Sequence, residues 1–60
     1  MRSIGYDRPT ATLEIQFEGG GVYRYQGVPV EIWQGLRQAA SKGKFFQAHV
    51  RDRFDTSRVD

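Results

Sequence analysis

Apolar and polar residues alternate between positions 11 and 18, where Leu13, Ile15 and Phe17 are separated by polar side chains. A period of two places every second side chain on the same face of a β-strand. The pattern therefore predicts a strand over residues 11–18 that buries one face and exposes the other.

The alternation resumes beyond three glycines, at Tyr23 and Tyr25, and predicts a further strand over residues 21–27. A three-residue hairpin loop needs a residue with positive φ, which glycine adopts without steric cost. We therefore expect Gly19–Gly21 to be the loop of a hairpin. In that register the opposite pairs are Glu18 with Val22, Phe17 with Tyr23, and Ile15 with Tyr25.

The pattern outside the hairpin predicts one more strand and a helix. A short apolar alternation around Ile4 and Tyr6 predicts a first strand over residues 3–7. Val28-Pro29 should end the sheet, because proline cannot donate to a β-ladder but suits the first turn of a helix. Apolar residues at helical spacing then predict a first helix that packs on the sheet. They are Pro29, Ile32, Trp33, Leu36 and Ala40.

A second short helix is expected after Ser41, which suits the N-cap position. Its apolar face comprises Phe46, His49, Val50 and Phe54. Residues 55–60 are polar and are expected to form a loose tail. The predicted fold class is α+β: a three-stranded antiparallel meander followed by two short helices packed on one face, in a single domain over residues 1–60.

The core of a 60-residue domain is small, so large side chains should supply much of the buried area. The expected core residues are Tyr6, Phe17, Tyr23, Trp33, Leu36, Phe46 and Val50.

Composition excludes several classes of protein. The chain has no cysteine, so it has neither a disulfide nor a thiolate metal site. It also lacks the run of about 18 apolar residues that a membrane span needs, and we expect a soluble, cytoplasmic protein with no membrane contact. The one histidine, His49, has helical spacing from Phe46 and Val50, which favours a structural role. We expect no catalytic residue, no metal and no cofactor.

Charge is distributed unevenly along the chain. The net charge is +2, with −1 on residues 1–36 and +3 on residues 37–60, and no acidic residue lies between Arg37 and Arg51. Basic side chains gain affinity for nucleic acids by releasing counterions from phosphates, but small domains also need charge for solubility, and both interpretations stay open.

The segment Tyr23-Arg24-Tyr25 also has two interpretations. Exposed aromatic rings beside arginines on a sheet can stack on unpaired bases, whereas the predicted register places both tyrosines in the core. The candidate nucleic-acid-binding residues are Arg24, Tyr25, Arg37, Lys42, Lys44, Arg51 and Arg53.

Several segments match a known pattern in their order and spacing. They are Ile4-Gly5-Tyr6-Asp7, Leu13-x-Ile15-x-Phe17, Gly20, Tyr23-x-Tyr25, Val28-Pro29, Leu36, Ala39, Ser41-x-Gly43-x-x-Phe46 and Val50-Arg51. In these features the chain resembles the KTSC domain, a short module named for its occurrence at the C-terminus of some lysyl-tRNA synthetases and also found as a stand-alone bacterial or phage protein. The resemblance implies a compact α+β domain, suggests RNA binding and supplies no catalytic residues.

Two functional hypotheses follow. The first is a small non-enzymatic binding module for RNA or another nucleic acid. The alternative is a protein-interaction module, or a phage or host regulatory protein, that docks on a partner protein or self-associates through a sheet edge. Nucleic-acid binding should weaken steeply with salt and an apolar protein contact should not, so salt dependence separates the two. The sequence does not indicate an oligomeric state.

Overall fold

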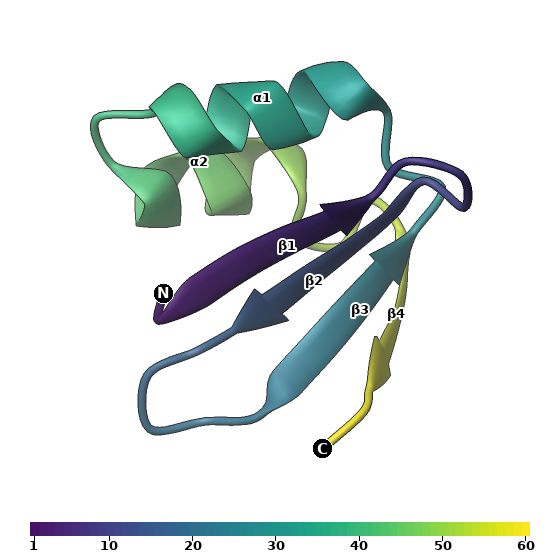
Figure 1. Ribbon diagram of the computed structural model, residues 1–60. Helices are drawn as coiled ribbons and strands as arrows, with labels where there is room; N and C mark the ends of the chain where they lie inside the picture. Colours follow the sequence, from purple (N-terminus) through teal and green to yellow (C-terminus); the bar gives the residue numbers. More distant parts are fainter.

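A four-stranded antiparallel sheet carries two helices on one of its faces in the computed structural model, which describes residues 1–60 (Figure 1). The strands lie side by side in the order β1-β2-β3-β4. The predicted α+β class, with a three-stranded meander followed by two helices, is confirmed, and a short fourth strand is added to it. In chain order the elements are β1 (Ser3–Asp7), β2 (Thr12–Gln16), β3 (Val22–Gln26), α1 (Val30–Gln38), α2 (Lys42–His49) and β4 (Asp55–Arg58).

The fourth strand is the element that the sequence does not predict. Residues 55–58, which were expected to belong to a loose tail, pair with β3 and place Thr56 opposite Tyr25. The Val59 amide extends this pairing by donating to the Val22 carbonyl (2.9 Å). All four β4 residues are exposed, so backbone hydrogen bonds rather than buried side chains hold the strand.

The register of β2 and β3 differs from the predicted one by two residues. Ile15 lies opposite Tyr23 rather than Tyr25. The reason is a longer turn, in which the Phe17 amide donates to the Gly21 carbonyl (3.2 Å), so that Phe17 leaves the ladder. A shift of one residue would turn every side chain to the other face, whereas a shift of two keeps the apolar side chains facing the helices.

The core lies between the sheet and the helices, and it is more aliphatic than the sequence suggests. Of the expected core residues, Leu36 and Val50 are buried, while the aromatic residues Tyr6, Phe17, Tyr23, Trp33 and Phe46 are half-buried and pack around the core. Large rings at the rim of so small a core keep an edge in water. The buried apolar residues are Leu13, Ile15, Tyr25, Val28, Leu36 and Val50.

The two helices approach each other closely at Gly35. A Cβ atom built there would lie 2.5 Å from Cζ of Phe45, so the absence of a side chain makes room for the Phe45 ring. The turn between the helices ends at Ser41, whose hydroxyl oxygen accepts a hydrogen bond from the Lys44 amide (3.3 Å). Ser41 is thus the N-cap of α2, as the sequence predicts.

Of Gly19 and Gly20, we expect Gly19 to tolerate a side chain less. Its φ is +68°, and that left-handed conformation costs other residues about 1–2 kcal/mol. At Gly20 a Cβ would meet only the Phe17 Cβ, at an ordinary 3.7 Å. Gly19→Ala should therefore lower the free energy of unfolding in urea by about 1–2 kcal/mol, whereas Gly20→Ala should leave it unchanged or raise it slightly. Equal tolerance at both positions would contradict this turn.

Candidate nucleic-acid interface

Exposed positive charge is concentrated on the helical layer. Residues 30–53 contain five basic side chains but only two acidic ones, Glu31 and Asp52. All five basic residues are exposed. We call them the basic helix surface; they are Arg37, Lys42, Lys44, Arg51 and Arg53.

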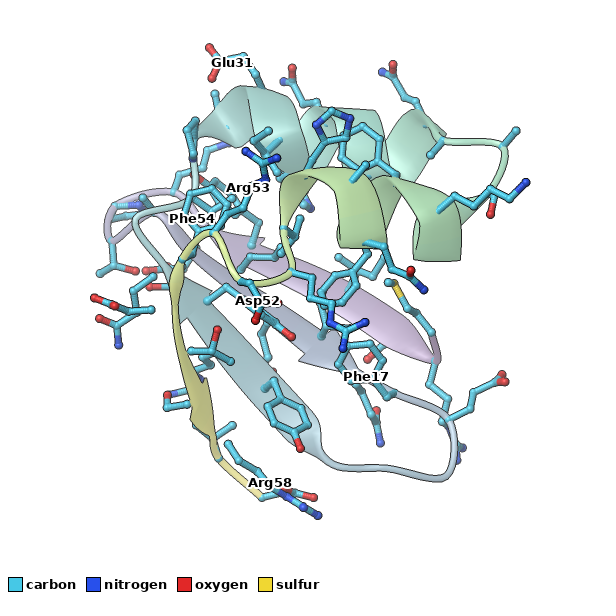
Figure 2. The ribbon with its side chains drawn as sticks, turned by 180° about the vertical axis from the view of Figure 1, so that it is seen from behind. Phe17, Glu31, Asp52, Arg53, Phe54 and Arg58 are labelled. Atoms are coloured by element: carbon cyan, nitrogen blue, oxygen red, sulfur yellow. The ribbon has the colours of Figure 1, made fainter.

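The basic helix surface draws on both helices and on the turn that follows them. Arg37 lies in the last turn of α1, and Lys42 and Lys44 lie in the first turn of α2. Arg51 and Arg53 follow the end of α2. Figure 2 shows Arg53 in the segment that leads toward β4. The five cations that the sequence singles out from residue 37 onward thus lie on the two helices and on the turn that follows them.

Most of these cations have no acidic partner. Arg51 Nε lies 3.9 Å from a carboxylate oxygen of its neighbour Asp52, which is a long contact between two exposed side chains. The other four basic side chains of the surface have no carboxylate at ion-pair distance. Their charge is therefore available to an anionic ligand.

Arg24, another candidate residue, lies on the opposite face of the sheet. It pairs across the strands with Glu14, with Nε and Oε1 2.8 Å apart. A shallow groove on this open face is lined by polar side chains, including Asp7, Thr12 and Gln26. Arg24 is therefore partnered, and it is separated from the basic helix surface by the thickness of the domain.

Tyr25 belongs to the core rather than to a binding surface. Only 5% of it is exposed, and its ring packs edge-to-face against Phe46, with centroids 5.6 Å apart. Burial raises the pKa of the Tyr25 phenol. The expectation that Tyr25 contacts a nucleic acid is thus corrected, because no face of its ring is open to a base.

A second group of basic and aromatic side chains lies between α1 and β1. The indole of Trp33 stacks on the ring of Tyr6, with centroids 5.0 Å apart and planes inclined by 13°. The guanidinium carbons of Arg37 and Arg8 lie over the same indole, 4.7 and 5.6 Å from its centroid. We call these four residues the aromatic–arginine cluster. Neither arginine has a carboxylate partner.

Sequence reasoning missed this cluster. Part of the cluster could have been predicted from the sequence. Trp33 and Arg37 are four residues apart on a predicted helix, and residues at that spacing are neighbours on the helix surface. Arg8 gives no such signal, since it lies in the turn between β1 and β2 and reaches Trp33 only through the fold. The ring of Tyr6, on which Trp33 stacks, is held in place by its hydroxyl group, which donates a hydrogen bond to the Val28 carbonyl (2.5 Å).

Other kinds of site find little support in the structure. No group of three or more His, Cys, Asp or Glu side chains is placed to hold a metal ion. His49 packs against Phe45, with ring centroids 4.5 Å apart. Both helices are too short to span a membrane.

The comparisons with known proteins agree with this architecture. Residues 1–54 match the family model of the KTSC domain. A protein from Stutzerimonas stutzeri is 46% identical over 46 residues, which are 77% of this chain and 65% of that protein. A lysine–tRNA ligase from Nostoc punctiforme is 35% identical over 54 residues, which are 90% of this chain but only 10% of the ligase.

A solved structure extends the likeness to three dimensions. The crystal structure of a KTSC domain protein from Yersinia pestis matches this fold with a TM-score of 0.94 at 41% identity, over 97% of this chain and 82% of that one. With the family match over residues 1–54, this shows that the chain belongs to the KTSC domain family.

Proposed function

We propose that this domain is a non-enzymatic, cytoplasmic binding module that contacts RNA or another nucleic acid through the basic helix surface. One observation carries the proposal: four exposed cations on the helical layer have no carboxylate partner, namely Arg37, Lys42, Lys44 and Arg53. Such cations displace condensed counterions from phosphates, and this release drives binding. The opposite sheet face carries acids and the Glu14–Arg24 pair, and it faces away from the nucleic acid.

The dimensions of α2 suit a short contact. Lys42 and Lys44 stand at its start, and Arg51 and Arg53 follow its end, so the four charges bracket a helix of eight residues, about 12 Å long at 1.5 Å per residue. That length fits about two or three phosphates, which predicts modest affinity and a salt slope near −0.7 per neutralised phosphate of a single strand. The similarity to a segment of a protein named lysine–tRNA ligase favours an RNA as the partner.

Removing the four charges around α2 should abolish binding. We expect the variant Lys42→Gln, Lys44→Gln, Arg51→Gln, Arg53→Gln to lose affinity for a short unstructured RNA by at least about tenfold, because each cation contributes to counterion release. Fluorescence anisotropy at low and moderate salt measures this loss, and circular dichroism checks that the fold is intact.

A matched control separates a specific surface from overall charge. The double variants Lys42→Gln/Lys44→Gln and Arg2→Gln/Arg24→Gln each remove two positive charges, the first pair from α2 and the second from the N-terminal part of the chain and β3. Only the first should weaken binding markedly. The proposal fails if the wild type does not bind at low salt, or if the quadruple variant binds as tightly as the wild type.

The sheet edges favour a second candidate, a protein-interaction module. β1 and β4 are the outer strands, and each presents a row of backbone groups that no neighbouring strand pairs. A partner segment or a second copy could add a strand at either edge. Complexes of this kind should survive at high salt, where phosphate contacts are screened, and sedimentation equilibrium in high and low salt would distinguish them.

A further inference from the structure

We propose that the groove on the open sheet face is a binding site for a neutral, hydroxyl-rich ligand, namely a saccharide. The groove has a volume of about 670 Å³, within the range of about 300–1,000 Å³ that ligand sites occupy. It lies on the face of the sheet that carries no helix (Figure 1). The inference therefore goes beyond the proposed function and does not depend on it.

The floor of the groove is the backbone at Gly5, in the middle of β1. Glycine weakens the interior of a strand, and its presence there often marks a place where a ligand approaches the backbone closely. Nothing inside the domain requires a glycine at this position. Its φ is not positive, and a Cβ atom built there would meet no other atom within 4 Å. The missing side chain thus opens space toward solvent rather than toward another part of the chain.

A charged pair lies beside this floor. The strand register places Glu14 opposite Gly5, and Arg24 opposite Glu14. Arg24 Nε donates to Glu14 Oε1 (2.8 Å), which leaves the second carboxylate oxygen free to accept and the terminal guanidinium nitrogens free to donate. A hydroxyl group donates to the first and accepts from the second, so neighbouring hydroxyls of a sugar match the pair.

Further polar groups line the groove near the turn between β1 and β2. The Thr10 hydroxyl donates to the Asp7 carboxylate and lies 2.9 Å from the hydroxyl oxygen of Thr12. The side-chain amide of Gln26 lines the same groove and has no hydrogen-bond partner in the domain. Side chains that are already ordered by hydrogen bonds lose less entropy on binding, which favours a ligand held by Asp7.

The charge of the groove favours a neutral ligand over an ion. Its lining contains two carboxylates and one guanidinium, so an anion would be repelled by Asp7 and Glu14, and a cation by Arg24. Only one of the eight lining residues is hydrophobic, which excludes an apolar ligand. That residue is Tyr6, whose ring stacks on Trp33 on the helix side. Because no aromatic ring covers the groove, we expect millimolar affinity.

Nuclear magnetic resonance of the ¹⁵N-labelled full chain tests the site. We would titrate the chain with glucose, galactose, mannose, ribose and maltotriose in turn. At least one of these sugars should cause saturable shifts of the Gly5, Thr12 and Arg24 amides, while the amides of Lys42 and Lys44 in α2 stay unchanged. Since the ligand carries no charge, added salt should change the midpoint by less than about twofold.

The decisive variant is Gly5→Val. Valine suits a strand and its Cβ meets no neighbour, so the free energy of unfolding in urea should stay unchanged or rise. Sugar binding should nevertheless weaken at least about tenfold, because the new side chain fills the floor of the groove. Arg24→Gln should weaken binding about three- to tenfold through the lost charge-assisted hydrogen bonds. Lys44→Gln, which removes the same charge from the helical layer, is the matched control and should have no effect.

The outcomes separate this inference from the proposed function. Shifts that fail to saturate with every sugar, or equal binding by the wild type and Gly5→Val, would overturn the saccharide site. Gly5→Ala and Arg24→Gln give the same test with a smaller change to the fold. A steep loss of affinity with salt would show that the groove binds an ion, and would also overturn the inference. None of these results bears on RNA binding, which Arg24→Gln should leave intact.

Discussion

Replacing Phe46 by alanine is expected to lower the free energy of unfolding by about 3–5 kcal/mol. Phe46 is the side chain through which α2 meets aromatic rings of β3 and of the turn before it, edge-to-face with Tyr25 at 5.6 Å and with Phe17 at 5.5 Å. Its removal deletes buried area and leaves a cavity between α2 and β3. Since a domain of this length has a total stability of about 3–9 kcal/mol, the variant should be largely unfolded at room temperature.

Urea denaturation followed by far-ultraviolet circular dichroism measures this effect. Phe46→Leu is the control, because leucine keeps most of the buried volume and loses only the ring contacts; this variant should stay folded. If Phe46→Ala were within about 1 kcal/mol of the wild type, the docking of α2 on the sheet would have to rest on other side chains.

Gly35→Val is expected to destabilise the domain by about 1–3 kcal/mol, through overpacking between the helices. A Cβ at this position comes within 2.5 Å of Cζ of Phe45, so the ring must move or the helices must separate. The direction of the effect is informative. Helix propensity alone predicts the opposite, since glycine within a helix is less favourable than other residues by a few tenths to about 1 kcal/mol.

A double-mutant cycle with Phe45→Ala identifies the cause. Once the Phe45 ring is absent, Gly35→Val should be neutral or stabilising, because only the helix propensity remains. Thermal unfolding is a suitable measurement, since 1 kcal/mol shifts the Tm of so small a domain by roughly 4–8 °C. An equal loss of stability in both backgrounds would show that the contact between Gly35 and Phe45 is not the cause.

The sequence predicts most of the fold because period-two alternation and helical spacing are strong in it. Leu13 and Ile15 mark the buried face of β2, and both are fully buried in the structure. The β2–β3 register was wrong because a run of glycines does not reveal where a turn begins, and Phe17 reads as a strand residue although it belongs to the turn. β4 could not be predicted, since an edge strand held only by its backbone has no apolar pattern.

The candidate site also has a part that the sequence predicts and a part that it does not. The segment from Arg37 to Arg51, which has no acidic residue, can be read directly from the sequence, and its basic side chains are exposed on the helical layer. The alternation of apolar and polar residues also predicts that Tyr25 is buried. Its neighbour Arg24 nevertheless made Tyr25 a candidate for stacking on a base, and that prediction was wrong. The contact between Arg8 and Trp33 depends on how β1 lies beneath α1, which no local pattern encodes.

The pairing of β4 has a consequence for the order in which the domain forms and opens. Short turns join β1, β2 and β3, whereas residues 27–54 separate β3 from β4 along the chain. Bringing β4 to β3 closes this long segment, which costs more chain entropy than closing a short turn. Folding should therefore begin in the meander and finish at the C-terminal strand. Since β4 buries no side chain, it should also be the first element to detach in the native state. Its detachment would expose the edge of β3 while the meander and both helices remain folded.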